Sequence, residues 1–217
     1  MYNIVSNIKH QLDIGMSDYP LNIFEVCKNI SNVDIKAVPF KTDDLRGIVS
    51  LARNESEIHA ILVNSNKSFE EQNFHGFHEL MHIPTVDQPG TILRCFDTIK
   101  PTQDSYLEWL ANEGAAEFVA PYYALLPMVK DEIDVMSEYI GTWNFCDNHS
   151  VDFGVSPIVL QNRIESLKYE IFQYLNGVPL DKIEVLSLNK QKQRGISVKS
   201  LVELENERLR KMQHIAM

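Results

Sequence analysis

The feature that most constrains this chain is a helix-forming segment with marked ends at residues 67–84, which reads KSFEEQNFHGFHELMHIP. Ser68 followed three residues later by Glu71 is a capping box, the pattern that begins a helix. Pro84 ends the helix, because proline has no backbone N–H to donate and its ring blocks the preceding turn. The segment therefore predicts one helix that carries the motif HELMH in its last turns.

The motif HELMH at residues 78–82 matches H-E-x-x-H. Residues four apart lie one above the other on a helix, about 6 Å apart at Cβ, so His78 and His82 can converge on one cation. Zinc accepts imidazole nitrogen and, in a catalytic site, keeps one position open for water, from which Glu79 can take a proton. His75 lies about 10 Å along the helix from His82, too far to be a ligand. The competing interpretation is a chance match on an exposed helix.

Two histidines are insufficient, so a third ligand must come from elsewhere in the chain. Residues 105–126, SYLEWLANEGAAEFVAPYYALL, are helical in composition, with Pro121 as a break and Pro127 as a stop. This segment supplies three candidate ligands, Glu108, Glu113 and Glu117. Glu113 and Glu117 share a helix face, so one of them could bind a metal while the other hydrogen-bonds a ligating histidine. The alternative is that both are solvated helix carboxylates.

The first half of the chain predicts an α+β fold. Residues 20–32 have the apolar spacing of an amphipathic helix. Alternating and β-branched residues then predict three strands, at 33–40, 45–52 and 58–65. Because the connections are too short for a parallel crossover, we expect a small three-stranded antiparallel sheet before the HELMH helix. Residues 85–105 contain Pro89, Gly90 and Pro101 and are expected to be mostly loop.

The second half is predicted to be mainly helical, with helices over 130–144 and 156–176. A short strand at 181–189 and a polar helix from Ser197 complete the chain. We divide the sequence into three segments, 1–130 with the HELMH motif, 131–177, which resembles a helix-turn-helix, and 178–217. A helix-turn-helix would suggest a transcription factor. Its reading helix, however, offers only Arg163 and Lys168 against Glu165 and Glu170, so a packing helix is favoured.

Composition limits the classes of partner. The formal net charge is −10, from 20 basic and 30 acidic residues, so the overall field opposes nucleic acid and no direct nucleic-acid binding is expected. No run approaches the ~18 apolar residues of a membrane span, and the N-terminus lacks a secretory signal pattern. Three widely spaced cysteines form no CxxC pair, which favours free thiols in a reducing compartment. We therefore expect a cytoplasmic protein.

Three stretches together resemble the ImmA/IrrE family of metallo-endopeptidases, in the form typical of phage or mobile elements. They are ILVNS before the motif helix, FHGFHELMH, and NEGAAEFVAPYYALLP, which is similar to the family's E-x-x-A-x-x-F-A-x-x-L-x-P segment. FGVSPIVLQNRIESL resembles the helical segment that follows in many relatives. The resemblance implies a zincin-like fold for residues 1–130. It implies Zn²⁺ bound by His78, His82 and Glu113, with Glu79 as the general base.

The resemblance also implies a function, proteolysis of an intracellular regulatory protein such as a helix-turn-helix repressor. The first hypothesis is therefore a zinc-dependent endopeptidase. The second is a non-catalytic, metal-stabilised regulatory or protein-binding module, in which the same ligands would close a four-coordinate site. The residue that stabilises the oxyanion is left open among four candidates, His75, Tyr122, Tyr123 and His149.

Overall fold

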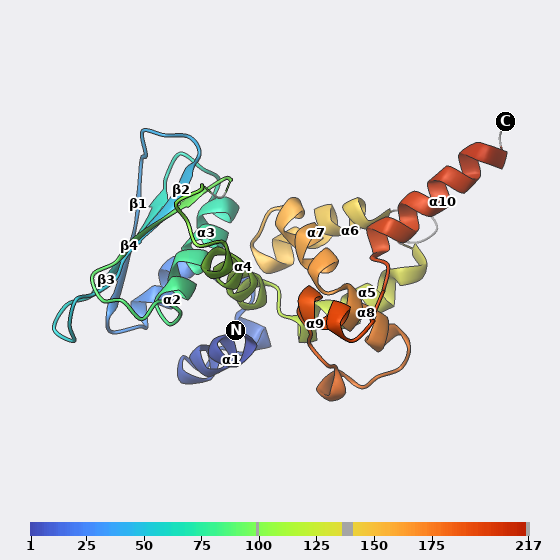
Figure 1. The fold of residues 1–217 in the computed structure, drawn as a ribbon, viewed down its shortest axis with the longest axis horizontal. Coiled ribbons are helices and arrows are strands. Elements are labelled where there is room, and N and C mark those ends of the chain that lie inside the picture. Colours follow the sequence, from blue (N-terminus) through green and yellow to red (C-terminus); the bar gives the residue numbers. More distant parts are fainter. Residues whose placement is uncertain (99, 136–140, 216–217) are drawn as a thin grey trace. The chain divides into compact units, whose positions relative to one another are not determined.

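The computed structural model describes residues 1–98, 100–135 and 141–215 (Figure 1). Residue contacts divide the chain into two compact units. Unit 1 comprises Met1–Val119 with Asp152–Val155, and unit 2 comprises Ala120–Val151 with Ser156–Met217. The three segments drawn from the sequence, 1–130, 131–177 and 178–217, stay predictions.

Unit 1 is built on a four-stranded mixed sheet (Figure 1). Its strands are β1 (Val33–Val38), β2 (Leu45–Ser50), β3 (His59–Asn64) and β4 (Ile92–Phe96). The spatial order is β1-β3-β2-β4. Strand β1 pairs with β3 in parallel, whereas β2 pairs antiparallel with both β3 and β4.

The prediction of three antiparallel strands is therefore wrong in two respects. Strand β3 lies between β1 and β2 in the interior of the sheet, where burial of Ile61 and Val63 removes their apolar surface from water. Strands β1 and β2, which are consecutive in the sequence, are therefore not neighbours in the sheet. Strand β3 lies between them and is parallel to β1. The fourth strand lies in the predicted loop. It has only five residues, and within it only Cys95 is buried, so its apolar alternation is too weak to mark a strand.

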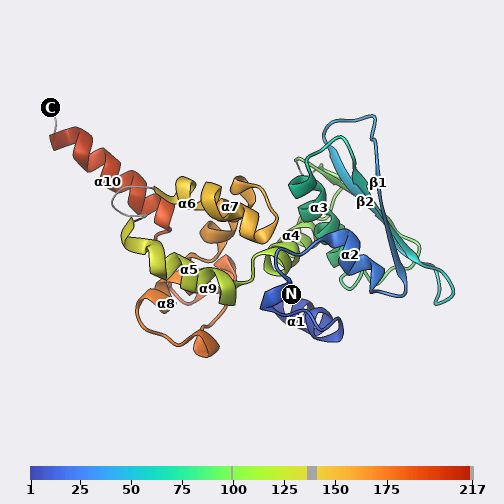
Figure 2. The same ribbon diagram turned by 180° about the vertical axis from the view of Figure 1, so that it is seen from behind.

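Helices α1 (Tyr2–Gln11), α2 (Ile23–Lys28), α3 (Phe69–His82) and α4 (Ser105–Val119) complete unit 1, with a 3₁₀ turn at Met16–Asp18. A second 3₁₀ turn, Ser150–Phe153, has its first two residues in unit 2 and its last two in unit 1. Helix α3 packs on β2 and β3, and α2 and α4 lie beside it on the same side of the sheet (Figure 2). The buried side chain of Asn73 joins these parts. It accepts from the Ile23 amide at 2.8 Å and donates to the carbonyls of Leu21 and Gly154, each at 2.9 Å.

The regular elements of unit 2 are all helical within its described residues. Its elements are α5 (Tyr122–Val135), α6 (Gly141–His149), α7 (Pro157–Ser166), α8 (Lys168–Leu175), a 3₁₀ turn at Leu180–Lys182, α9 (Leu188–Gln193) and α10 (Leu201–Ile215). Pro127 lies inside α5 and does not stop it, contrary to expectation. The predicted helix at 130–144 includes residues 136–140, which lie outside the described residues. No helix in the described chain is long and apolar enough to cross a membrane.

The short strand predicted at 181–189 is not formed. A strand needs a neighbouring strand to pair its backbone groups. Here side chains of α8 take that place, because Gln173 accepts from the Glu184 amide at 3.0 Å and Glu170 accepts from the Leu186 amide at 2.9 Å. The apolar alternation of this segment therefore reflects packing against a helix.

Lys9 provides a test of how α1 is held on α4. Its side chain is 6% exposed, and its ammonium donates at 2.8 Å to the carbonyl of Glu117 at the C-terminal end of α4. Replacing Lys9 by Met keeps the apolar stem and removes the donor. We expect the free energy of unfolding to fall by about 1–3 kcal/mol, because a charge-assisted hydrogen bond near a helix C-terminus is lost.

The matched control is Lys28→Met. Lys28 pairs with Glu25 at 2.6 Å on an exposed surface, and such a pair contributes less than about 1 kcal/mol. Urea denaturation followed by circular dichroism measures both changes. Equal losses for the two variants would show that the Lys9 contact does not hold α1.

Candidate metal centre

Helix α3 begins and ends where the sequence predicts. The Ser68 side chain accepts from the Glu71 amide, and the Glu71 carboxylate accepts from the Ser68 amide, so the capping box is formed. The helix ends at His82, immediately before Ile83 and Pro84. The whole HELMH motif is therefore helical, and its side chains are buried.

Helix α4 approaches α3 closely along this buried part. The rings of Phe77 and Phe118 stack with centroids 5.0 Å apart. A Cβ atom at Gly114 would lie 2.6 Å from the sulfur of Met81, closer than real Cβ contacts, so the methionine side chain occupies space that glycine leaves open. The short distance between the helices lets polar side chains from both meet at the HELMH motif.

Three potential ligand atoms converge between the two helices. The Nε2 atoms of His78 and His82 lie 3.1 Å apart. Glu108 from α4 places Oε2 at 3.2 Å from His78 Nε2 and Oε1 at 3.8 Å from His82 Nε2. The Oδ1 atom of Asn112, one turn further on, lies 2.9 Å from His78 Nδ1. That contact favours the tautomer in which Nδ1 donates, which leaves the Nε2 lone pair directed at the cluster.

These donors fit a divalent metal ion. Two ligand atoms held at about 2.0–2.1 Å by one tetrahedral zinc are about 3.3–3.4 Å apart, close to the spacings between His78, His82 and Glu108. Two imidazole nitrogens that face each other in a buried site both offer lone pairs unless a proton or a cation lies between them. Nitrogen and carboxylate oxygen are the donors that zinc uses in hydrolytic sites. The chemistry and the spacing of the set are therefore those of a metal centre.

Glu79 lies beside this cluster without a hydrogen-bond partner. Its side chain is fully buried, and neither carboxylate oxygen has a donor. Burial, and then the neighbouring charge of Glu108, raise the pKa of Glu79 well above its usual range. The site is shaped by Gly47 of β2, since a Cβ atom there would lie 2.8 Å from Glu79 Cγ. The sheet thus leaves space for the Glu79 carboxylate but supplies no hydrogen-bond donor to it.

A second group of possible ligands shares part of the same site. Atoms of His78, Glu79 and Cys95 lie within 4.8 Å of one another. The sulfur of Cys95 lies 3.9 Å from His75 Nδ1, and burial lowers the pKa of His75 to about 3, which keeps its ring neutral. His75 belongs to neither group of candidate ligands among the described residues, as its position along α3 suggests.

The structure brings Glu108, and not Glu113, to the two histidines. Glu113 is half-buried on another side of α4 and belongs to neither group of candidate ligands among the described residues. Glu117 lies near the end of the helix, where its carbonyl accepts from Lys9. The ligand role of Glu113 therefore stays a prediction that the geometry does not favour.

The signal for Glu108 is present in the sequence. The family segment has alanines three and seven residues after its first glutamate. Ala111 and Ala115 satisfy that spacing from Glu108, as Ala116 and Ala120 satisfy it from Glu113. The two registers differ by five residues, and only the packing of α4 on α3 distinguishes them.

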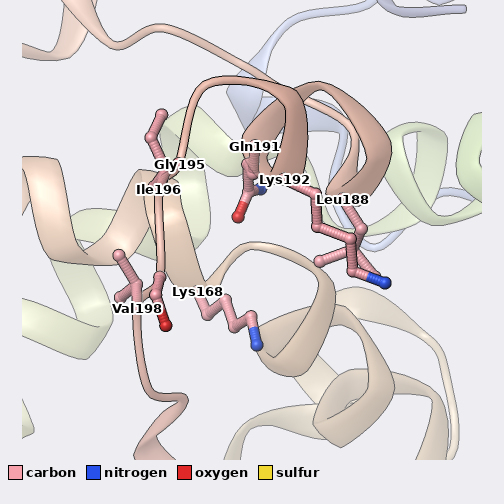
Figure 3. Close-up of a pocket in the computed structure, with 8 residues that line it drawn as sticks. Lys168, Leu188, Gln191, Lys192, Gly195, Ile196 and Val198 are labelled. Atoms are coloured by element: carbon pink, nitrogen blue, oxygen red, sulfur yellow. The ribbon is translucent and has the colours of Figure 1, made fainter.

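The other residues singled out from the sequence lie elsewhere. Tyr122, Tyr123 and His149 belong to unit 2, and His149 lies 2.7 Å from the Glu132 carboxylate. Unit 2 also contains a pocket of about 350 Å³ (Figure 3). Its lining residues are Lys168, Leu188, Gln191, Lys192, Gly195, Ile196, Ser197 and Val198. It includes none of the candidate ligands and is not part of the metal centre.

Gly47 allows a test of the room around Glu79. Gly47→Ala should lower the free energy of unfolding by about 1–3 kcal/mol, because the added methyl must displace a carboxylate that is packed on all sides. Gly15→Ala is the control, since its Cβ would meet only Asp18 Oδ2, at 3.7 Å. Chemical denaturation compares the two. If Gly47→Ala proves as stable as Gly15→Ala, the Glu79 side chain is not confined as described.

Comparison with known proteins agrees with this site. The family model described as IrrE N-terminal-like domain, a peptidase family, matches residues 31–165, well over half of the chain. The match includes both α3 and α4 with their converging side chains. No curated protein shows a significant sequence match. The resemblance noted in the sequence is confirmed, and the chain belongs to the ImmA/IrrE family of metallopeptidases.

Proposed function

We propose that this protein is a zinc-dependent endopeptidase whose zinc ion is held by His78, His82 and Glu108. The observation that carries the proposal is the convergence of these three buried donors beside Glu79. Three protein ligands leave one position of a tetrahedral zinc for water or substrate, which is the arrangement of catalytic sites. Family membership makes a metal-dependent peptidase the expected activity.

Glu79 is proposed as the general base and acid. A zinc ion held by these residues would supply a Lewis acid for the peptide carbonyl and would lower the pKa of a bound water molecule. Glu79 takes the proton from the attacking water on one carboxylate oxygen and later delivers it to the nitrogen of the leaving amine. Because neither oxygen has a hydrogen-bond donor in the protein, the carboxylate is free to take up this proton.

Asn112 and Glu108 keep the histidines in place. Asn112 accepts from Nδ1 of His78, which fixes the ring so that Nε2 points toward His82 and Glu108. Ligating histidines commonly depend on such a partner for their tautomer and orientation. Asn112 is therefore proposed as a positioning residue.

The substrate is proposed to be an intracellular regulatory protein, such as a helix-turn-helix repressor encoded nearby on a phage or mobile element. The support is the resemblance to the ImmA/IrrE family, which the family match strengthens. A cytoplasmic location is proposed because Cys27, Cys95 and Cys146 are free and buried, as expected of thiols in a reducing compartment.

The burial of the site favours one alternative, a metal-stabilised module without turnover. His78 and His82 are each 1% exposed, and structural metal sites are closed in this way. A structural site, however, has no use for a buried carboxylate without donors, whose burial costs free energy. Glu79 therefore favours catalysis, and its substitution distinguishes the two functions.

The ligand assignment predicts which glutamate retains the metal. Purified protein should contain about one zinc per chain by inductively coupled plasma mass spectrometry. Glu108→Ala should lose most of this zinc, because it removes one of three donors, whereas Glu113→Ala should retain it. The opposite result would restore Glu113 as the ligand, and zinc absent from the unsubstituted protein would remove the metal centre.

The catalytic role predicts a different result for Glu79→Gln. This isosteric change should leave the zinc content unchanged and lower the cleavage rate by about 10²–10⁴-fold, the usual contribution of a general base. Cleavage is followed by mass spectrometry on candidate repressors, with Glu70→Gln on the first turn of α3 as a surface control. Undiminished cleavage by Glu79→Gln would refute this mechanism. Absence of cleavage by the zinc-loaded unsubstituted protein, on every repressor tested, would favour the non-catalytic module.

A further inference from the structure

Helix α4 exposes two aromatic side chains close to the candidate metal centre. Tyr106 is 63% exposed and Trp109 is 41% exposed, and their rings stack with centroids 5.9 Å apart. Exposed tryptophan is uncommon, and tryptophan and tyrosine are the residues most enriched where proteins bind other chains. We call Tyr106 and Trp109 the aromatic pair.

The aromatic pair borders the metal centre through the residues next to it on α4. Glu108, which contacts both histidines, lies between the two aromatic residues in sequence, and Asn112, one turn after Glu108, contacts His78. Just before the helix, Gln103 donates at 2.9 Å to the carbonyl of Arg94 on β4. The aromatic pair therefore lies on the same turns of α4 as Glu108, at the end of the helix that follows the contact with β4.

The electrostatic surroundings of the aromatic pair are acidic. Unit 1 contains nine lysines and arginines and eighteen aspartates and glutamates, a formal net charge of −9, so it carries almost all of the charge of −10. Asp104 is exposed at the start of α4, and Glu113 follows Tyr106 and Trp109 on the same stripe of the helix.

Two basic side chains of this region form ion pairs with other residues of unit 1. Lys100 pairs with Asp44 at 2.7 Å, and Arg46 pairs with Glu71 at 2.6 Å. Successive side chains of a strand point to opposite faces of the sheet. Cys95 is buried on the face that packs against α3, so the exposed Arg94 side chain lies on the other face. A cation that approaches the aromatic pair therefore meets carboxylates and aromatic faces.

From this combination we infer that the aromatic pair binds an arginine- or lysine-bearing segment of the polypeptide substrate. This inference rests on the proposed function and adds the chemical class of substrate. A guanidinium or ammonium group over an aromatic face gains about 0.5–2 kcal/mol, most with tryptophan. A purely apolar segment could pack against the two rings, but the negative charge of unit 1 would not attract it. A DNA-binding repressor meets the requirement, because such proteins gather lysine and arginine on one face.

Trp109 can report this binding directly. The chain has two tryptophans, so the double variant Glu79→Gln/Trp143→Phe retains Trp109 as the single one and cannot consume a substrate peptide. The probe is a short peptide in which arginines alternate with serine and leucine. Two matched peptides carry glutamine or glutamate in place of every arginine. Trp109 fluorescence should be quenched by the arginine peptide, which should bind at least about fivefold more tightly than the glutamine peptide.

Substitutions locate the contact. Trp109→Leu, which keeps apolar area and removes the aromatic face, should weaken binding of a fluorescein-labelled arginine peptide measured by anisotropy, and Trp109→Phe should weaken it less. Glu113→Gln should also weaken it. Trp143→Phe alone should change nothing. Raising the salt concentration from about 50 to about 500 mM should weaken the arginine peptide selectively.

Equal binding of the glutamine peptide, preference for the glutamate peptide, or absence of binding by all three would overturn the inference. Thermal unfolding identifies a Trp109 variant that fails to fold, in which case Tyr106→Leu and Glu113→Gln decide the question. The proposed function is tested separately. If the arginine peptide binds at Trp109 but the zinc-loaded unsubstituted protein cleaves nothing, the proposed function fails. If cleavage occurs with the same kcat/KM for arginine and glutamine peptides, the substrate class fails.

Discussion

The packing of α4 against α3 is the interaction on which the rest of unit 1 depends. Phe77 stacks on Phe118, and Gly114 lets the two helices approach at Met81. This approach is what brings a carboxylate of α4 to the imidazoles of α3. A bulkier residue at 114 would have to displace the methionine side chains that now fill the space between the helices.

The sheet makes a different contribution, since it surrounds Glu79 and offers it no hydrogen bond. A buried carboxylate without donors costs free energy, and native proteins rarely contain one without a reason. The reason proposed here is proton transfer. Gly47 is part of the same arrangement, because any side chain at that position would occupy the space of the carboxylate.

Helix α4 serves the site from two sides. Glu108 and Asn112 contact His78 of α3, whereas Tyr106 and Trp109 are exposed to solvent. Because a helix turns about 100° per residue, neighbours in sequence belong to different surfaces. In the function proposed here, one helix therefore contributes both to the metal centre and to the surface that binds the substrate.

The sequence alone determined the local features. The capping box at Ser68 and Glu71, the end of α3 before Pro84, and the placing of His78 and His82 one turn apart follow from rules that act within a few residues. Only the tertiary structure decided the order of the strands, the pairing of β4 and the choice of Glu108 over Glu113 as neighbour of the histidines. Strand order depends on which apolar side chains reach the centre of the sheet, and the choice of glutamate depends on how one helix lies on another. Both are contacts between distant parts of the chain, which no periodicity within a segment records.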